Sequence, residues 1–142
     1  MVTVQQVYDI AIHLMDEQDE NSGSTSTIDT AEYKLRTISI LNSLIPGLYA
    51  YSGTFKQVSK GRAAPKQLFT DNYAEPDFDQ NIPLDDVLSL SVLPYFLAAQ
   101  LLSSENAELA AWMKNQGREV LDDIRVKVPA EFEAITTPYG LF

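Results

Sequence analysis

The residues able to perform acid–base or metal chemistry are few, and the single histidine, His13, is the first to consider. Asp9 and Glu17 stand four residues before and after it, so a local ion pair on a helix surface is the expected role. A catalytic role would require a nucleophile or a second ligand, and the sequence indicates neither. The chain has no cysteine, which excludes a disulfide framework, a thiolate nucleophile and a cysteine-based metal site.

The clustered carboxylates give no stronger indication of a reactive centre. Asp85 and Asp86 could be paired catalytic acids, but adjacent residues on a helix do not face each other, and two acids suit the positive end of a helix. The acidic run 16–20 fails the calcium-loop pattern, because Gln18 and Glu20 stand where Asp or Asn is needed. Phosphate-binding glycine loops and a serine nucleophile elbow are absent from the sequence. We therefore predict no enzyme activity, no metal and no cofactor.

Charge is distributed unevenly, and this is the clearest functional signal in the sequence. The chain of 142 residues has a net charge of −10, yet segment 56–70 holds four basic residues and no acidic one. Such a segment attracts an acidic protein surface, a second copy of this chain or phosphate, although the acidic surroundings disfavour nucleic acid. The alternative is a solvated loop. The residues predicted to contact a partner are Lys56, Lys60, Arg62 and Lys66, with Phe55 and Phe69 beside them as apolar anchors.

The C-terminal residues 125–142 form the second signal. They contain two prolines and no helical start signal, which favours an extended tail. The tail ends in the apolar side chains of Tyr139, Leu141 and Phe142. Because exposed aromatic groups are unfavourable in water, we expect the tail either to fold back on its own core or to dock on a neighbour.

Apolar periodicity supplies the elements that must position these segments. Helices are predicted at about 4–16, 30–45, 84–103 and 105–124. Thr3 and Gln6 have the spacing of a capping box at the first helix, and Asp29 with Glu32 repeats that spacing at the second. Pro46 and the glycine after it are expected to end the second helix.

The predicted helix 84–103 is apolar nearly all round, so we expect it at the centre of the fold. Pro94 lies inside it and should kink it, because proline removes a backbone donor and clashes with the preceding turn. Glycine at position 117 lowers the stability of the last helix by about 1 kcal/mol relative to alanine, but it would let another helix approach closely.

The segment 46–83 is predicted to be a long loop in which the apolar pieces 49–51, 55–58 and 67–69 could form a β-hairpin. A connection this long is unusual in a small domain unless it is functional. Residues 1–142 are therefore predicted to form a single, mainly α domain of about four helices in a bundle, with a long middle loop and an extended tail. No apolar stretch reaches the roughly 18–20 residues of a membrane span, so no membrane partner is expected.

The order of these segments resembles the head–tail connector proteins of tailed bacteriophages, also called adaptor or head-completion proteins. The resemblance covers most of the chain at the level of architecture, through TAEYKLRTISILNSLIPGLY (30–49) and IPLDDVLSLSVLPYFLAAQLLSSENAELAAWMKNQGREVLDDI (82–124). It is strongest in LPYFLAAQLLSSENAELAAWMKN, where a helix rich in Leu and Ala passes through a polar break into a second helix. No individual residue matches a known contact of the family.

The resemblance implies a structural virion protein without catalytic activity. Members of the family assemble as a ring beneath the portal, extend the DNA channel and present a docking surface to the next neck or tail protein. The implied partners are further copies of this chain, the portal protein and a downstream neck or tail protein, without sequence-specific binding of nucleic acid. The implied location is the neck of the virion, after synthesis in the host cytoplasm.

Two other functions remain open from the sequence. A small helical adaptor or regulatory protein that binds one protein partner would use the same basic segment and the same tail without forming a ring. An enzyme or small-molecule binder with carboxylates and tyrosines in a bundle core is the third, and no constellation of residues supports it.

Overall fold

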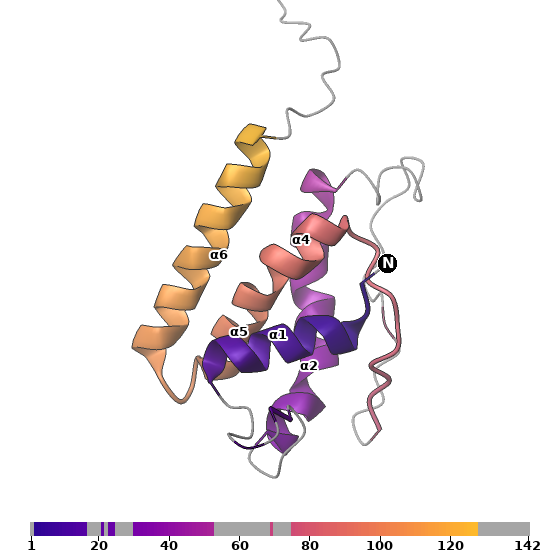
Figure 1. Cartoon of the computed structure of the whole chain (residues 1–142), viewed down its shortest axis with the longest axis vertical. Helices are drawn as coiled ribbons and strands as arrows, with labels where there is room; N and C mark the ends of the chain where they lie inside the picture. Colours follow the sequence, from indigo (N-terminus) through magenta and orange to yellow (C-terminus); the bar gives the residue numbers. More distant parts are fainter. Residues whose placement is uncertain are drawn as a thin grey trace, which may run out of the picture.

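The computed structural model describes residues 2–16, 21, 23–24, 30–52, 69 and 75–127, and this part of the chain is mainly helical, as predicted. The elements are α1 (Val4–Met15), α2 (Ala31–Leu44), the 3₁₀ helix η1 (Ile45–Tyr51), α4 (Asp86–Ser91), α5 (Leu93–Leu102) and α6 (Ala107–Lys127). Helix α5 stands between α2 and α6, and α1 lies crosswise against α5 (Figure 1). None of the helices in the described part is both long and apolar enough to span a membrane.

The predicted capping box at the start of α1 is confirmed. The backbone N–H of Gln6 donates to Thr3 Oγ1 (3.3 Å), and the N–H of Thr3 donates to Gln6 Oε1 (2.9 Å). The first two amides of the helix donate to the carbonyls of Gln80 (3.0 Å) and Phe78 (2.9 Å). These bonds satisfy amides that a helix leaves without intrahelical acceptors, and they tie the extended segment before α4 to the start of the chain.

The bounds of α2 agree with the predicted helix of about 30–45 to within one residue at each end. Thr30 occupies the N-cap position without a side-chain capping hydrogen bond, and Asp29, the predicted capping residue, lies outside the described residues. The α-helix ends at Leu44, just before Pro46, as predicted, and the chain continues into η1 instead of into the predicted loop. A proline in the first turn of a helix has no amide that needs an acceptor, so the 3₁₀ helix tolerates it there. The candidate strand piece 49–51 is therefore helical, and the predicted loop begins later than residue 46.

The predicted central helix is two helices. Helices α4 and α5 meet at Val92, and Pro94 lies in the first turn of α5. The helical path continues across this point, because the N–H of Val92 donates to the carbonyl of Leu88 (3.1 Å) and the N–H of Phe96 donates to the carbonyl of Val92 (3.3 Å). Pro94, which has no N–H to donate, therefore interrupts the regular helix without ending its course. The central position of α5 is confirmed, since Leu93, Leu97 and Leu101 have no exposed surface.

A tight helical hairpin joins α5 to α6. Asn106 Oδ1 accepts the backbone N–H of Leu109 (3.1 Å) and so caps the start of α6. The helix continues to Lys127, which corrects the prediction that an extended tail begins at residue 125. The close approach expected at Gly117 is confirmed, because a Cβ atom there would lie 2.8 Å from Cε1 of Phe96.

Candidate partner interface

The seven residues predicted to contact a partner all lie outside the described residues. They are Lys56, Lys60, Arg62, Lys66, Tyr139, Leu141 and Phe142. The candidate hairpin around residue 61 also lies outside them, as does Phe55. The structure instead describes the points from which the two segments leave the helices, at Ser52 and at Lys127.

Both boundaries of the basic segment are held by polar contacts. The buried hydroxyl of Ser52 donates to Asp85 Oδ1 (3.4 Å) at the start of α4. The N–H of Phe69 donates to Asn42 Oδ1 (3.0 Å), and Asn42 Nδ2 donates to the carbonyl of Phe69 (3.3 Å). The Phe69 side chain is only 3% exposed, so the interpretation of Phe69 as an anchor for a partner is wrong. Its aromatic ring is part of the buried core instead.

Three of the four exposed large apolar side chains of the described residues lie at one end of the molecule. They are Tyr51 (38% exposed), Val87 (56%) and Leu90 (40%). The contact between Ser52 and Asp85 places the end of η1 at the start of α4, and the last turns of α6 reach the same end (Figure 1). We call this region the open end and define it by the exposed residues Tyr51, Val87 and Leu90. Both segments with predicted contact residues leave from it.

The acidic residues at the open end have structural explanations. Asp85 occupies the N-cap position of α4 and Asp86 lies in its first turn, which is the helix-start role predicted for them. The Asp85 side chain makes no capping hydrogen bond, and one of its oxygens accepts the Ser52 hydroxyl. Among the described residues, no group of three or more His, Cys, Asp or Glu side chains could hold a metal ion.

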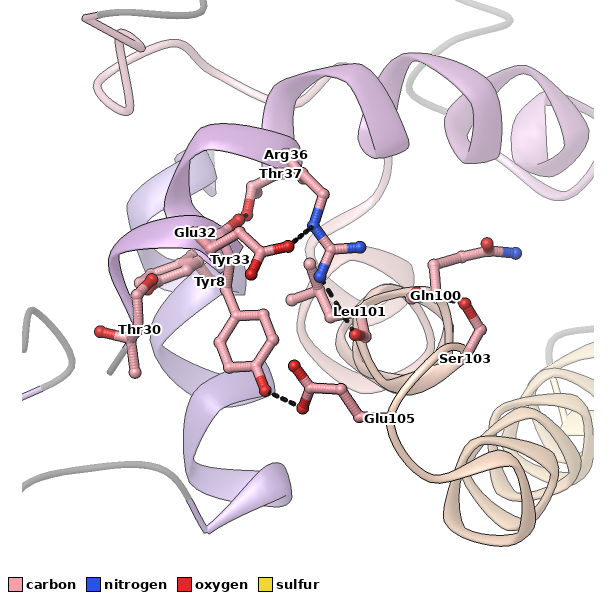
Figure 2. Close-up of polar contacts among 10 residues, drawn as sticks. All are labelled: Tyr8, Thr30, Glu32, Tyr33, Arg36, Thr37, Gln100, Leu101, Ser103 and Glu105. Carbon is pink, nitrogen blue, oxygen red and sulfur yellow. Dashed lines mark hydrogen bonds and ion pairs between the residues drawn. The ribbon is translucent and has the colours of Figure 1, made fainter. Parts of the chain in front are cut away.

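A polar clamp, which sequence reasoning missed, joins α2 to the turn between α5 and α6 (Figure 2). The Tyr33 hydroxyl donates to the Glu105 carboxylate, and Arg36 Nη2 donates to the carbonyl of Leu101 (3.3 Å). Arg36 Nε also lies 3.4 Å from Glu32 Oε1, one helical turn earlier. The spacing of Glu32 and Arg36 in the sequence could have indicated this ion pair. The clamp joins α2 to the end of α5 and to the turn that follows it.

The buried tyrosines Tyr8 and Tyr49 have raised pKa values. Burial raises the pKa of Tyr49 to about 12. Burial also raises the pKa of Tyr8, and a hydrogen bond with the Thr30 side chain opposes this rise in part. Both hydroxyls therefore stay protonated near neutral pH, where neither can act as a base. His13 is exposed in the last turn of α1, as predicted for a surface residue.

A shallow hollow of about 410 Å³ lies between the start of α2 and residues 75–76. Its lining is Ala31, Lys34, Leu35, Glu75 and Pro76. This lining offers one cation and one carboxylate on an open surface, whereas small-molecule sites are enclosed and direct several polar groups at the ligand. The open end is the better candidate for a functional surface.

No protein-family profile, curated protein or solved structure matches this chain.

Proposed function

We propose that this chain is a structural assembly protein of a tailed bacteriophage, a head–tail connector that forms a ring between the portal and the tail. In this role it extends the DNA channel, resides in the neck of the virion and performs no catalysis. Two lines of reasoning support the proposal. One is the resemblance of the sequence to connector proteins, and the other is the arrangement of the open end.

The open end is the observation that carries the proposal. Exposed apolar residues on monomeric proteins are usually scattered, whereas a cluster at one place indicates a contact surface. Val87 and Leu90 lie three residues apart on α4, so they share one face of that helix. The described residues that precede the basic segment and the tail, Ser52 and Lys127, belong to the elements that reach this same end.

The net charge also suits a DNA conduit. Phosphate attracts Lys and Arg, and a chain of net charge −10 repels it over most of its surface. DNA could therefore pass through a ring of such chains without adhering to the wall. The basic segment then remains available for acidic surfaces of protein partners.

The test is attachment of the purified protein to DNA-filled heads that lack it. We expect the double variant Val87→Asp/Leu90→Asp to attach at least about tenfold more weakly, because buried carboxylates without partners oppose an apolar contact. Lys60→Glu/Arg62→Glu should weaken attachment through charge repulsion. Ser104→Asp in the turn between α5 and α6 is the matched control and should attach normally, since Ser104 is exposed at the opposite end.

Two results would contradict the proposal. Normal attachment by the Val87/Leu90 variant would remove the open end as the contact surface, provided that its helical circular dichroism matches the wild type. A stable one-to-one complex with a single partner and no binding to heads would instead favour the adaptor function.

A further inference from the structure

Helix α6 stands at the edge of the molecule, where it packs against α5 and, near its end, against α4 (Figure 1). A row of buried or half-buried residues faces these helices, and it includes Ala110, Met113, Gly117, Val120 and Ile124. The rest of the helix surface faces away from the described part of the chain. That surface carries charges of opposite sign on its two sides.

The position of each residue around the helix axis follows from the period of 3.6 residues per turn, or about 100° per residue. On one side lie Lys114 and Arg118, one turn apart and both exposed, which we call the basic flank. On the other side lie the exposed residues Glu108, Trp112, Glu119 and Asp123, which we call the acidic flank. The buried row lies between the two flanks, so they point in different directions along the surface.

The charged side chains on both flanks are exposed and form no ion pair among the described residues. None of Glu108, Lys114, Arg118, Glu119 and Asp123 takes part in an ion pair there. Two like charges four residues apart repel each other and weaken an isolated helix by a few tenths of a kcal/mol. This applies to the basic pair 114 and 118 and to the acidic pair 119 and 123. Neither flank therefore forms an ion pair within the described part of one copy. The opposite flank of another copy could supply the complementary charge.

We propose that α6 is the contact helix between copies of this chain, with the acidic flank of one copy docked on the basic flank of the next. The inference rests on the proposed ring and names the surface that closes it. Contact between two different surfaces is the head-to-tail type that generates rings. A two-fold dimer through the acidic flank would instead place acid against acid, which is unfavourable.

Helix geometry puts the opposite charges at matching heights. When the ring axis is parallel to α6, equivalent residues of all copies lie at the same height along that axis. Arg118 then lies within one residue of the level of Glu119, about 1.5 Å along the axis, and Lys114 lies within two residues of Trp112. A cation over the face of an indole is a favourable contact. Trp112 is 52% exposed, and tryptophan is among the residues that most often dominate interface energies.

The single tryptophan of the chain makes the contact measurable. Because Trp112 lies on the acidic flank, its fluorescence reports directly on docking there. We expect the emission to shift to shorter wavelength as the wild type associates in low-salt buffer, and sedimentation velocity to show larger species at the same concentrations. Added salt should reverse both changes, since exposed charge pairs are screened.

Charge-reversal variants with a mixing step test the pairing itself. Lys114→Glu/Arg118→Glu makes both flanks acidic, and Glu119→Lys/Asp123→Lys makes them predominantly basic. Each variant alone should associate at least about tenfold more weakly than the wild type. An equimolar mixture should recover association, because every contact then joins opposite charges. Ser104→Glu, away from both flanks, is the control and should behave as the wild type.

Cross-linking identifies the surfaces even when association is weak. A carbodiimide joins a lysine amine to a carboxylate without a spacer, and a mixture of unlabelled and nitrogen-15-labelled chains separates links between copies from links within one copy. We expect Lys114 of one copy to be linked to Glu108 or Glu119 of another when heads are present.

The outcomes distinguish this inference from the proposed function. If the reversed variants still form rings on heads, the flanks are not the contact and the inference is wrong, while the connector function stands. If no links form between copies on heads and the mixture does not associate, the inference is also wrong. Recovery in the mixture together with links from Lys114 would support it.

Discussion

Replacement of Leu97 by alanine lowers the free energy of unfolding by about 3 to 5 kcal/mol. Leu97 has no exposed surface and lies in α5, the helix that packs against α1, α2, α4 and α6. The substitution removes buried methyl groups and leaves a cavity among these helices, and both effects destabilise the folded state. Urea denaturation followed by circular dichroism measures the change.

The matched control is Leu90→Ala, the same chemical change on α4 where the side chain is 40% exposed. This substitution should lower the free energy of unfolding by no more than about 1 kcal/mol, because the Leu90 side chain buries less apolar surface than Leu97 does. Equal effects of the two substitutions would show that α5 is not the centre of the core.

Replacement of Gly117 by leucine destabilises the α5–α6 hairpin by about 1 to 3 kcal/mol. A Cβ at this position would lie 2.8 Å from Phe96 Cε1 and 3.1 Å from Tyr95 Cβ, so a larger side chain must displace one helix from the other. This cost exceeds the gain of about 1 kcal/mol that a residue with higher helix propensity than glycine brings. Thermal unfolding and urea denaturation would both show the loss.

Two further variants separate crowding from other effects of leucine. Asn115→Leu places the same side chain at an exposed position of α6 and should leave stability nearly unchanged or slightly raised. Phe96→Ala should recover part of the loss in the Gly117→Leu background, because it removes the ring that the new side chain meets. If Gly117→Leu were as stable as the wild type, the close packing of α5 and α6 would be refuted.

The sequence was most informative where one local interaction decides the outcome. Thr3 and Gln6 predicted the start of α1 because both halves of the capping box lie within four residues. Pro94 predicted a kink because proline lacks the donor that every interior helix residue requires, and the regular helix is interrupted at Val92, two residues before it. The central position of α5 followed from apolar residues on all of its sides.

Predictions failed where tertiary contacts override local signals. The loop predicted to begin at residue 46 starts instead with η1, whose Leu48 and Tyr49 are buried in the core. Phe69 was predicted beside a partner contact because its neighbours are polar and basic. Only the fold shows that Asn42 holds its backbone and that its ring is buried.

The candidate interface was predictable only in part. Sequence reasoning singled out the basic segment and the apolar tail, but it could not place their points of departure at one end of the molecule. That placement depends on the contact between Ser52 and Asp85 and on the antiparallel course of α6. The two flanks of α6 follow from the helical period once its buried residues are known. Gly117 by itself was not enough to identify those buried residues from the sequence.

The most direct test of the connector proposal is a tagged pull-down from the native source, with the recovered complex imaged by negative-stain electron microscopy. We predict a closed ring, alone or seated on the larger ring of a portal. A compact monomer or a one-to-one complex, with no ring even when all structural proteins of the source are present, would contradict the connector function.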